Sequence, residues 1–205
     1  MEHYDIGNYR VTFDPLEHRY YIDGREVASI SGIVREMLPA HYKNVDADIL
    51  EKAKQKGKAL RDMIEHYERY GQKAYHPEMQ GYIALKRQHQ FDVLESETVV
   101  LLWHHGAIIA AGRFDMVVAS PYMDGTGIAD VRRMAHFKEA HVTLQLNLYK
   151  RAYEQTYKRR IDYLKCIHLR GRFKDYVDIP VNPKMVDETL EDYIEHHPID
   201  YTAFL

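Results

Sequence analysis

The sequence predicts an α/β (α+β) fold in which a mixed central β-sheet is flanked by helices and preceded by an N-terminal β-hairpin. Apolar residues recur at helical spacing in some segments and alternate with polar residues in others. These segments follow the order helix, strand, strand, strand, helix, strand, which is typical of helices packed on a mixed sheet. Hydrophobic residues make up 45% and charged residues 29% of the 205 positions, a composition that favours a globular chain over a disordered one.

The hairpin is predicted near the N-terminus, where short β-forming runs surround the dipeptide Asp23-Gly24. An Asp-Gly pair between such runs is a strong signal for a tight hairpin turn. A helix is expected to follow from about Ser31 to Met37, because Pro39 disfavours helical backbone in the residue before it. The predicted strands of this part are residues 9–13, 18–22 and 25–27.

A long helix is predicted over residues 46–70, where apolar residues share one face at three- and four-residue steps. Asp46 is expected to cap its start, and Gly71 is expected to end it. A second helix is predicted over residues 78–91. The shared face of the first helix is formed by Ile49, Ala53, Gly57, Leu60, Ile64 and Tyr67.

From residue 97 onward the apolar pattern changes to alternation, which indicates strands. Helical spacing returns over residues 141–157 and 187–196. The strands are predicted at residues 97–103, 107–118, 128–131, 161–169 and 176–179, with turns at 104–106 and 121–127. The chain is expected to form one domain, with a hairpin and helix in residues 1–45, a core in residues 46–180, and a helix and tail in residues 181–205.

Cysteine and histidine usage limits the kinds of metal site that the sequence predicts. Cys166 is the only cysteine, so an intramolecular disulfide, a cysteine-based zinc site and an iron–sulfur cluster are all excluded. The pairs His104-His105 and His196-His197 are expected at a turn and at a helix end. Neither pair has a third ligand at metal-binding spacing in the sequence, so surface positions are predicted for both.

Membrane and secretory signals are not expected in this sequence. No segment approaches the roughly 18 consecutive apolar residues that a membrane-spanning helix needs. The first five residues, Met1 to Asp5, lack the pattern of a secretory signal peptide. The sequence therefore predicts a cytoplasmic protein without a membrane partner.

A basic block lies within an otherwise acidic chain. The formal net charge is −3, but residues 131–175 contain twelve Lys and Arg residues against four acidic ones, a net charge of +8. Such a block can face the phosphates of a nucleic acid or can be a solvated helix surface, and charge alone does not decide between them. The candidate nucleic-acid-binding residues in this block are Arg133, Lys138, Lys150, Arg151, Arg159 and Arg160.

Two aspartates within predicted strands are the first candidates for chemistry. Asp115 follows Gly112 in the long second core strand, and Asp130 lies in the apolar start of the third. A carboxylate in an apolar strand is costly unless a cation, a metal ion or a hydrogen bond compensates it. Neighbouring antiparallel strands can bring two such carboxylates together, which suits a divalent cation that prefers oxygen ligands. The alternative interpretation is a pair of edge residues or salt-bridge partners.

Five short motifs occur in an order and spacing that rarely coincide by chance. They are His18-Arg19-Tyr20-Tyr21-Ile22-Asp23-Gly24 with Ile30-Ser31-Gly32-Ile33, Gly57 through Ile64-Glu65, Gly112-x-x-Asp115, Asp130-Val131-Arg132, and Gln145-x-x-x-Tyr149. Together they resemble the PD-(D/E)XK nuclease superfamily, in its RecB-like, phage-type exonuclease branch, over most of the chain. The resemblance implies a restriction-endonuclease-like core, hydrolysis of phosphodiester bonds, and DNA with a recombination or phage protein as partners.

The resemblance also implies roles for individual residues. Asp115 and Asp130 would be ligands of Mg²⁺ or Mn²⁺, with the Val131 carbonyl completing the site. Gln145 and Tyr149, four residues apart on one helix face, would lie toward the active site or the DNA backbone, the alternative being a helix-packing pair. The supporting carboxylates are Glu65 and Glu97, of which the latter is also interpretable as the start of a strand.

Two positions depart from the family pattern. The family has a histidine where this chain has Arg61, and its catalytic lysine corresponds to Arg132. Guanidinium is planar, bulky and always charged, and it has no lone pair to offer a metal ion, so neither exchange is conservative. The alternative for Arg61 is a surface ion pair with Glu65, four residues later on the same helix.

Three functions are therefore weighed from the sequence. The first is a metal-dependent DNA nuclease, and the second is a nuclease fold that binds DNA or a protein partner without cleaving. The third is a structural component of a phage or mobile element. The basic block favours the first two hypotheses, and the replacements at Arg61 and Arg132 favour the second over the first.

Overall fold

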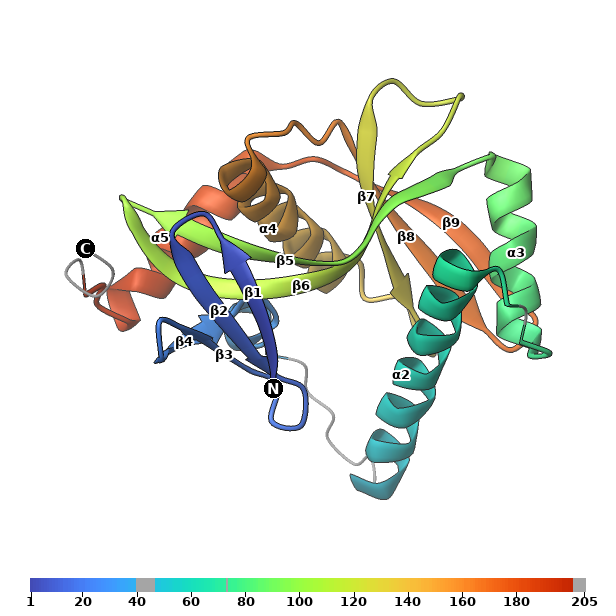
Figure 1. Ribbon diagram of the computed structural model, residues 1–205, viewed down its shortest axis with the longest axis horizontal. Helices are drawn as coiled ribbons and strands as arrows, with labels where there is room; N and C mark the ends of the chain where they lie inside the picture. Colours follow the sequence, from blue (N-terminus) through green and yellow to red (C-terminus); the bar gives the residue numbers. More distant parts are fainter. Residues whose placement is uncertain (40–46, 73, 201–205) are drawn as a thin grey trace.

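The computed structural model describes residues 1–39, 47–72 and 74–200, and a mixed β-sheet runs through its centre (Figure 1). Within these residues nine strands join one sheet, confirming the predicted mixed α/β class with an N-terminal hairpin. The strands are β1 (Glu2–Ile6), β2 (Tyr9–Asp14), β3 (Arg19–Ile22), β4 (Arg25–Ser29), β5 (Asp92–His104), β6 (Ala107–Ala119), β7 (Thr126–Arg132), β8 (Tyr163–Arg170) and β9 (Phe173–Ile179).

The strand order is β1-β2-β3-β4-β6-β7-β8-β9, with β5 paired to β6. The β4–β6 and β7–β8 pairs are parallel and the others are antiparallel. β5 pairs with one edge of β6 along nearly its whole length. Both β4 and β7 therefore pair with the other edge of β6. On that edge β4 pairs with residues 110–111 and β7 with residues 116–119. Neither β4 nor β7 pairs with residues 112–115 of β6, so the sheet divides into two branches beside this stretch.

The helices cover the two faces of the sheet. Helices α1, α4 and α5 pack on one face with Phe114, Ile128 and Cys166, whereas α2 and α3 pack on the other with Met116 and Ala129. Figure 1 shows α2 and α3 beside the β7–β9 end of the sheet. The helices are α1 (Ile30–Met37), α2 (Ala47–Tyr70), α3 (Pro77–His89), α4 (Glu139–Tyr157) and α5 (Pro183–His196). No described helix is both long enough and apolar enough to cross a membrane.

Only the second half of α2 packs on the sheet. Leu60 and Ile64 are buried, whereas Ile49, on the same predicted stripe, is 61% exposed. Residues 51–59 are all exposed except Gly57, and this part of the helix projects from the body of the molecule (Figure 1). The expected N-cap, Asp46, lies outside the described residues.

The predicted elements are present, and most differences lie at their ends. β1 was not predicted, and β5 begins at Asp92, five residues before the expected start. α5 begins at Pro183 because proline suits the first turn of a helix and the Asn182 side chain accepts the Met185 N–H. These capping groups set the start of α5, whereas the apolar pattern used for the prediction begins only about one turn later, at residue 187.

Candidate functional site

A cleft opens where the sheet divides, between the second half of α2 and strands β5, β6 and β7. The empty space between these elements, open solvent included, is about 250 Å³. Its lining consists of Arg61, Ile64, Glu65, Glu68, Ser96, Glu97, Asp115, Met116 and Val131. Five of these had been singled out from the sequence, namely Arg61, Glu65, Glu97, Asp115 and Val131. The fold brings them together from four different elements.

Asp115 occupies the point where β6 and β7 separate. Their ladder ends at the Met116–Ala129 pair, and the next backbone contact is replaced by a side chain: Asp115 Oδ2 accepts the Val131 N–H at 2.6 Å. Burial raises the pKa of Asp115 well above its ordinary value, and the nearby Asp130 carboxylate raises it further, while Arg61 acts in the opposite direction. An ionised Asp115 therefore needs a compensating cation.

Asp130 and Arg132 lie on the opposite face of β7 from the cleft lining. Ala129 and Val131 pack in the core under α2 and α3, so the alternating residues face α4. Arg132 Nε lies 2.5 Å from Asp130 Oδ2, and the Asp130 side chain is only 5% exposed. These two atoms form an ion pair but no hydrogen bond of good geometry among the described residues. Burial lowers the pKa of Arg132, but the Asp130 and Asp115 carboxylates outweigh it, so the pKa is raised.

Gln145 and Tyr149 contact each other on the α4 side of the divided sheet. The Gln145 amide donates to the Tyr149 hydroxyl at 3.3 Å, as their four-residue spacing predicts. Burial, with the Asp130 charge second, raises the pKa of Tyr149 to about 12, so its hydroxyl stays protonated at neutral pH. Gly112 allows the Tyr149 ring to pack closely against β6, because a Cβ at this position would lie 2.8 Å from Tyr149 Cε1 and 2.9 Å from Ile30 Cδ1.

Glu97 reaches the site through a strained backbone. It lies opposite Asp115 in the β5–β6 ladder, between the Ser96–Met116 and Thr98–Phe114 pairs, and it has a φ of 51°. A non-glycine residue in this region costs about 1–3 kcal/mol and persists only where the surroundings enforce it. Burial raises the pKa of Glu97, the Arg113 guanidinium opposes the rise, and Glu65 adds to it.

Two residues of this site were not assigned a role from the sequence. Arg113 holds Glu97 through an Nε–Oε2 contact of 2.8 Å, contacts Glu2 at the same distance, and lies 4.7 Å from the ring centre of Phe13. Glu68 lines the cleft and accepts the Tyr82 hydroxyl at 2.8 Å. Arg113 stands inside the Gly112-x-x-Asp115 motif, and its basic side chain in an apolar strand was the available signal.

The surface ion pair of Arg61 with Glu65, the alternative interpretation of Arg61, is not present. Glu65 contacts Arg69 instead, at 3.0 Å, and Arg61 has no ion pair with a described residue. Arg61 is left beside Asp115, whose pKa it lowers. Arg61 therefore belongs to the cleft and is not part of a separate helix-surface pair.

The basic block of residues 131–175 is largely matched by acidic side chains. Arg133 contacts both oxygens of buried Glu78, at 2.9 and 3.0 Å. Lys138 immediately precedes α4. Further pairs of the block are Arg132 with Asp130, Lys150 with Glu154, Arg151 with Asp187, Arg159 with Glu95, Arg160 with Asp162, and Lys165 with Asp178. The Arg159 and Arg160 side chains are 69% and 83% exposed. A role of this block in nucleic-acid binding stays a prediction.

Comparisons with known proteins give little further information. No protein-family model matches the sequence, and no significant match is found among curated proteins. The protein in the crystal structure of SSO0001 has 15% sequence identity to this chain. The two structures align with a TM-score of 0.35 over 80% of this chain and 84% of the other. This likeness establishes neither fold nor function.

Proposed function

We propose that this protein is a metal-dependent DNA nuclease of the PD-(D/E)XK type, with a restriction-endonuclease-like core. One observation carries the proposal: carboxylates from separate elements converge where the sheet divides. Glu65 from α2, Glu97 from β5 and Asp115 from β6 line the cleft, and Asp130 lies on the opposite face of β7, near enough to Asp115 to raise its pKa. Arginines pair with three of these carboxylates, namely Glu65, Glu97 and Asp130. Asp115 has no ion pair among the described residues, and a cation is what would compensate its burial.

The residues present suit Mg²⁺ or Mn²⁺, which prefer carboxylate and carbonyl oxygens. The pKa of the Asp115 carboxyl is raised, and Asp130 Oδ2 has no hydrogen bond among the described residues. Asp115 and Asp130 would hold the ion together with the Val131 carbonyl. When bound, the ion would supply an activated water and stabilise negative charge on the attacked phosphate.

The chain's own residues would position the substrate around this centre. Arg132 is a fixed cation beside Asp130 and would stabilise charge on a phosphate oxygen. The Tyr149 hydroxyl, protonated because its pKa is about 12, would act as a hydrogen-bond donor rather than as a base. Arg113 would keep Glu97 turned toward the cleft.

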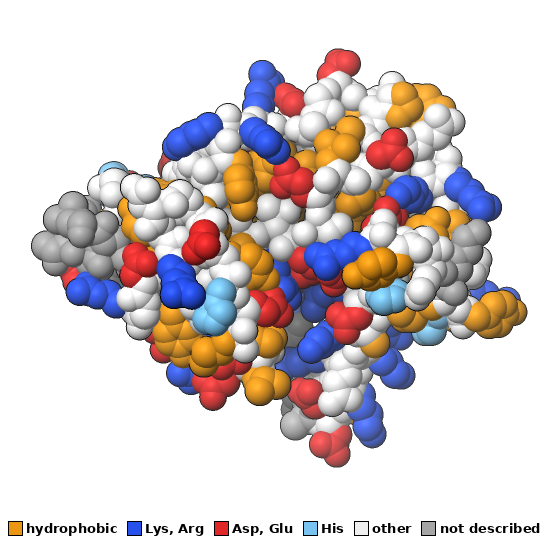
Figure 2. Space-filling view, in the orientation of Figure 1, with side chains coloured by type: hydrophobic (Ala, Val, Ile, Leu, Met, Phe, Trp, Pro, Cys, Tyr) orange, Lys and Arg blue, Asp and Glu red, His pale blue; other side chains and the backbone are white. Residues whose placement is uncertain are grey.

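A basic stripe on α2 supports a nucleic acid as the substrate. Lys54, Lys58, Arg61 and Glu65 follow four-, three- and four-residue steps, so they lie on one helix face that ends in the cleft. The two lysines are exposed on the projecting part of α2, where Figure 2 shows basic side chains. Their one ion pair within the described chain joins Lys54 Nζ to Glu51, at 3.8 Å. Like charges four residues apart destabilise a helix, and phosphates along this stripe would relieve the repulsion.

A second candidate function is nucleic-acid binding without cleavage. The observation that favours it is the ion pair between Arg132 and Asp130, in which a guanidinium occupies one oxygen of a proposed ligand. Arg61 adds a second fixed positive charge beside Asp115. Both charges would oppose the entry of a divalent cation.

Cleavage of linear single- and double-stranded DNA with Mn²⁺ tests the two functions. A nuclease should lose at least about 100-fold in rate in Asp115→Asn, because removed electrostatic groups of this kind cost about 10²–10³. Asp124→Asn, in the exposed turn between β6 and β7, is the matched control and should cleave normally. DNA binding without cleavage by the wild type would favour the second function.

The basic stripe is tested by neutralising its lysines. Lys54→Gln with Lys58→Gln should weaken duplex DNA binding and reduce the salt slope of log K by about 1.8, or about 0.9 for each lost phosphate contact. Lys52→Gln with Lys56→Gln makes the same charge change on the other side of the helix and should have a smaller effect. Equal losses in the two pairs, measured by fluorescence anisotropy, would contradict a directed track.

A further inference from the structure

The turn between β5 and β6 places two histidines side by side. It contains only His105 and Gly106, with φ values of 47° and 82°, which is the pattern of a type I′ turn. Asparagine is favoured at the first of these positions, so His105 is an unusual choice there. Neighbouring residues of a regular strand face opposite sides, but the His104 and His105 ring centres are 4.1 Å apart.

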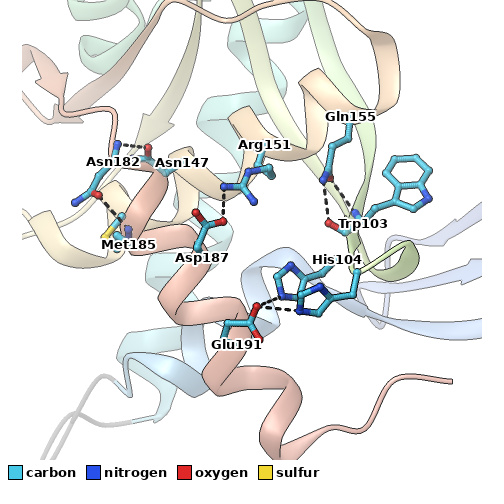
Figure 3. A network of polar contacts seen from close by, with 10 residues as sticks. Trp103, His104, Asn147, Arg151, Gln155, Asn182, Met185, Asp187 and Glu191 are labelled. Atoms are coloured by element: carbon cyan, nitrogen blue, oxygen red, sulfur yellow. Dashed lines mark hydrogen bonds and ion pairs between the residues drawn. The ribbon is translucent and has the colours of Figure 1, made fainter. Parts of the chain in front are cut away.

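Glu191 of α5 completes a group of three potential ligands. Its Oε1 lies 3.1 Å from His104 Nε2 and 2.9 Å from His105 Nε2 (Figure 3). The three atoms all lie within 4.8 Å of one another. One turn earlier in α5, Asp187 accepts a hydrogen bond of 2.7 Å from the Arg151 guanidinium, which joins α5 to α4. The third ligand that the sequence did not show therefore comes from 86 residues further along the chain.

We infer that His104, His105 and Glu191 form a binding site for a transition-metal ion, with Zn²⁺ as the best match. Two imidazole nitrogens and one carboxylate oxygen are a common zinc ligand set, with a fourth position left for water. Bonds of about 2.1 Å place tetrahedral ligands about 3.4 Å apart. The two separations from Glu191, 3.1 and 2.9 Å, are slightly shorter, and all three ligand atoms lie within 4.8 Å of one another, so small side-chain shifts would bring them to this spacing. The Glu191 side chain is 52% exposed, which leaves room for such a shift.

The site is separate from the proposed nuclease centre in place and in chemistry. His104 lies seven residues along β5 from Glu97, about 23 Å in an extended strand. Imidazole nitrogen suits zinc, nickel and copper, whereas magnesium and calcium prefer oxygen ligands. A bound ion would tie the β5–β6 turn to α5 and stabilise their packing. This inference does not depend on the proposed function.

Isothermal titration of the full chain with ZnCl₂, together with thermal melts, tests the site. His105→Asn places a residue that suits the type I′ turn, and Glu191→Gln keeps a hydrogen-bond acceptor, so both variants should fold. Each should weaken zinc binding by more than about tenfold, since losing even an outer-shell partner costs about 10- to 100-fold. His196→Asn, an exposed histidine of the same helix, is the control and should bind zinc like the wild type.

Three outcomes would overturn the inference. These are no zinc-dependent rise in Tm of the wild type, unchanged affinity in both site variants, or an equal loss in the His196→Asn control. Asp115→Asn distinguishes this site from the cleft, because it should retain the zinc-dependent rise. Loss of that rise in Asp115→Asn would place the zinc in the cleft instead.

Discussion

Replacing each central aspartate by asparagine should change stability in opposite directions when no divalent cation is present. Asp115→Asn removes a carboxylate whose pKa is raised by burial and by Asp130, and asparagine keeps an oxygen to accept the Val131 N–H. It should therefore stabilise the folded protein at neutral pH. Asp130→Asn removes the anionic partner of Arg132 and should destabilise the protein.

The magnitude for Asp130→Asn follows from the burial of the pair. Breaking a buried ion pair costs about 3–5 kcal/mol because the remaining charge is left uncompensated. The Arg132 side chain keeps 21% exposure, so the lower end, about 3 kcal/mol, applies. For a protein of this length 1 kcal/mol shifts Tm by about 2–4 °C, so Asp130→Asn should lower Tm by about 6–12 °C.

The gain from Asp115→Asn should depend on pH. A carboxyl group with a raised pKa in the folded protein contributes stability that is fully present below its unfolded pKa, which is about 3.9. That stability is lost as the pH rises through the folded pKa. The wild type should therefore lose stability relative to Asp115→Asn as the pH rises above about 4.

Thermal melts in EDTA and in Mn²⁺, from acidic to slightly alkaline pH, measure these effects. Mn²⁺ should raise the Tm of the wild type by mass action, and both variants should lose that rise. Asp124→Asn, an exposed aspartate in the turn, controls for the substitution itself. Shifts of the same sign in EDTA would refute the assignment of different electrostatic roles to the two aspartates, and a wild type unaffected by Mn²⁺ would refute the metal site.

The remaining predictions concern the altered positions and the close packing at the divided sheet. The double change Arg61→His and Arg132→Lys should raise Mn²⁺-dependent DNA cleavage above that of either single change, because it removes a fixed positive charge and restores a compact cation. A fall in cleavage would instead make the arginines catalytic in their own right. Gly112→Ala should destabilise the fold by about 1–3 kcal/mol in denaturant melts, because its Cβ would meet Tyr149 and Ile30 below 3.0 Å. An unchanged midpoint would show that the Tyr149 ring moves away freely.

The candidate aspartates could be predicted because their signals are local. Asp115 and Asp130 each stand in an apolar run of a strand, and a carboxylate there needs compensation wherever the strand is placed. Gly112 was part of the same motif, and the structure adds its reason, which is the close approach of Tyr149. The four-residue spacing of Gln145 and Tyr149 places them on one face of α4, where the Gln145 amide donates to the Tyr149 hydroxyl.

The charge of the basic block was misleading when counted along the chain. Its net charge of +8 counts only residues 131–175, whereas several of its cations pair with acids outside that segment. Glu78, Glu95 and Asp187 are examples from α3, β5 and α5. Electrostatic energy depends on distance in space, so a sum over sequence neighbours omits these partners.

The sequence by itself determined the order of helices and strands, the N-terminal hairpin and the two strand aspartates, because periodicity and burial cost are properties of short segments. Only the tertiary structure decided where the sheet divides, how Arg113 turns Glu97 toward Asp115, and which histidines meet Glu191. These features join residues that lie far apart in the chain. Their energies come from contacts that exist only once the strands and helices are packed, so no local pattern specifies them.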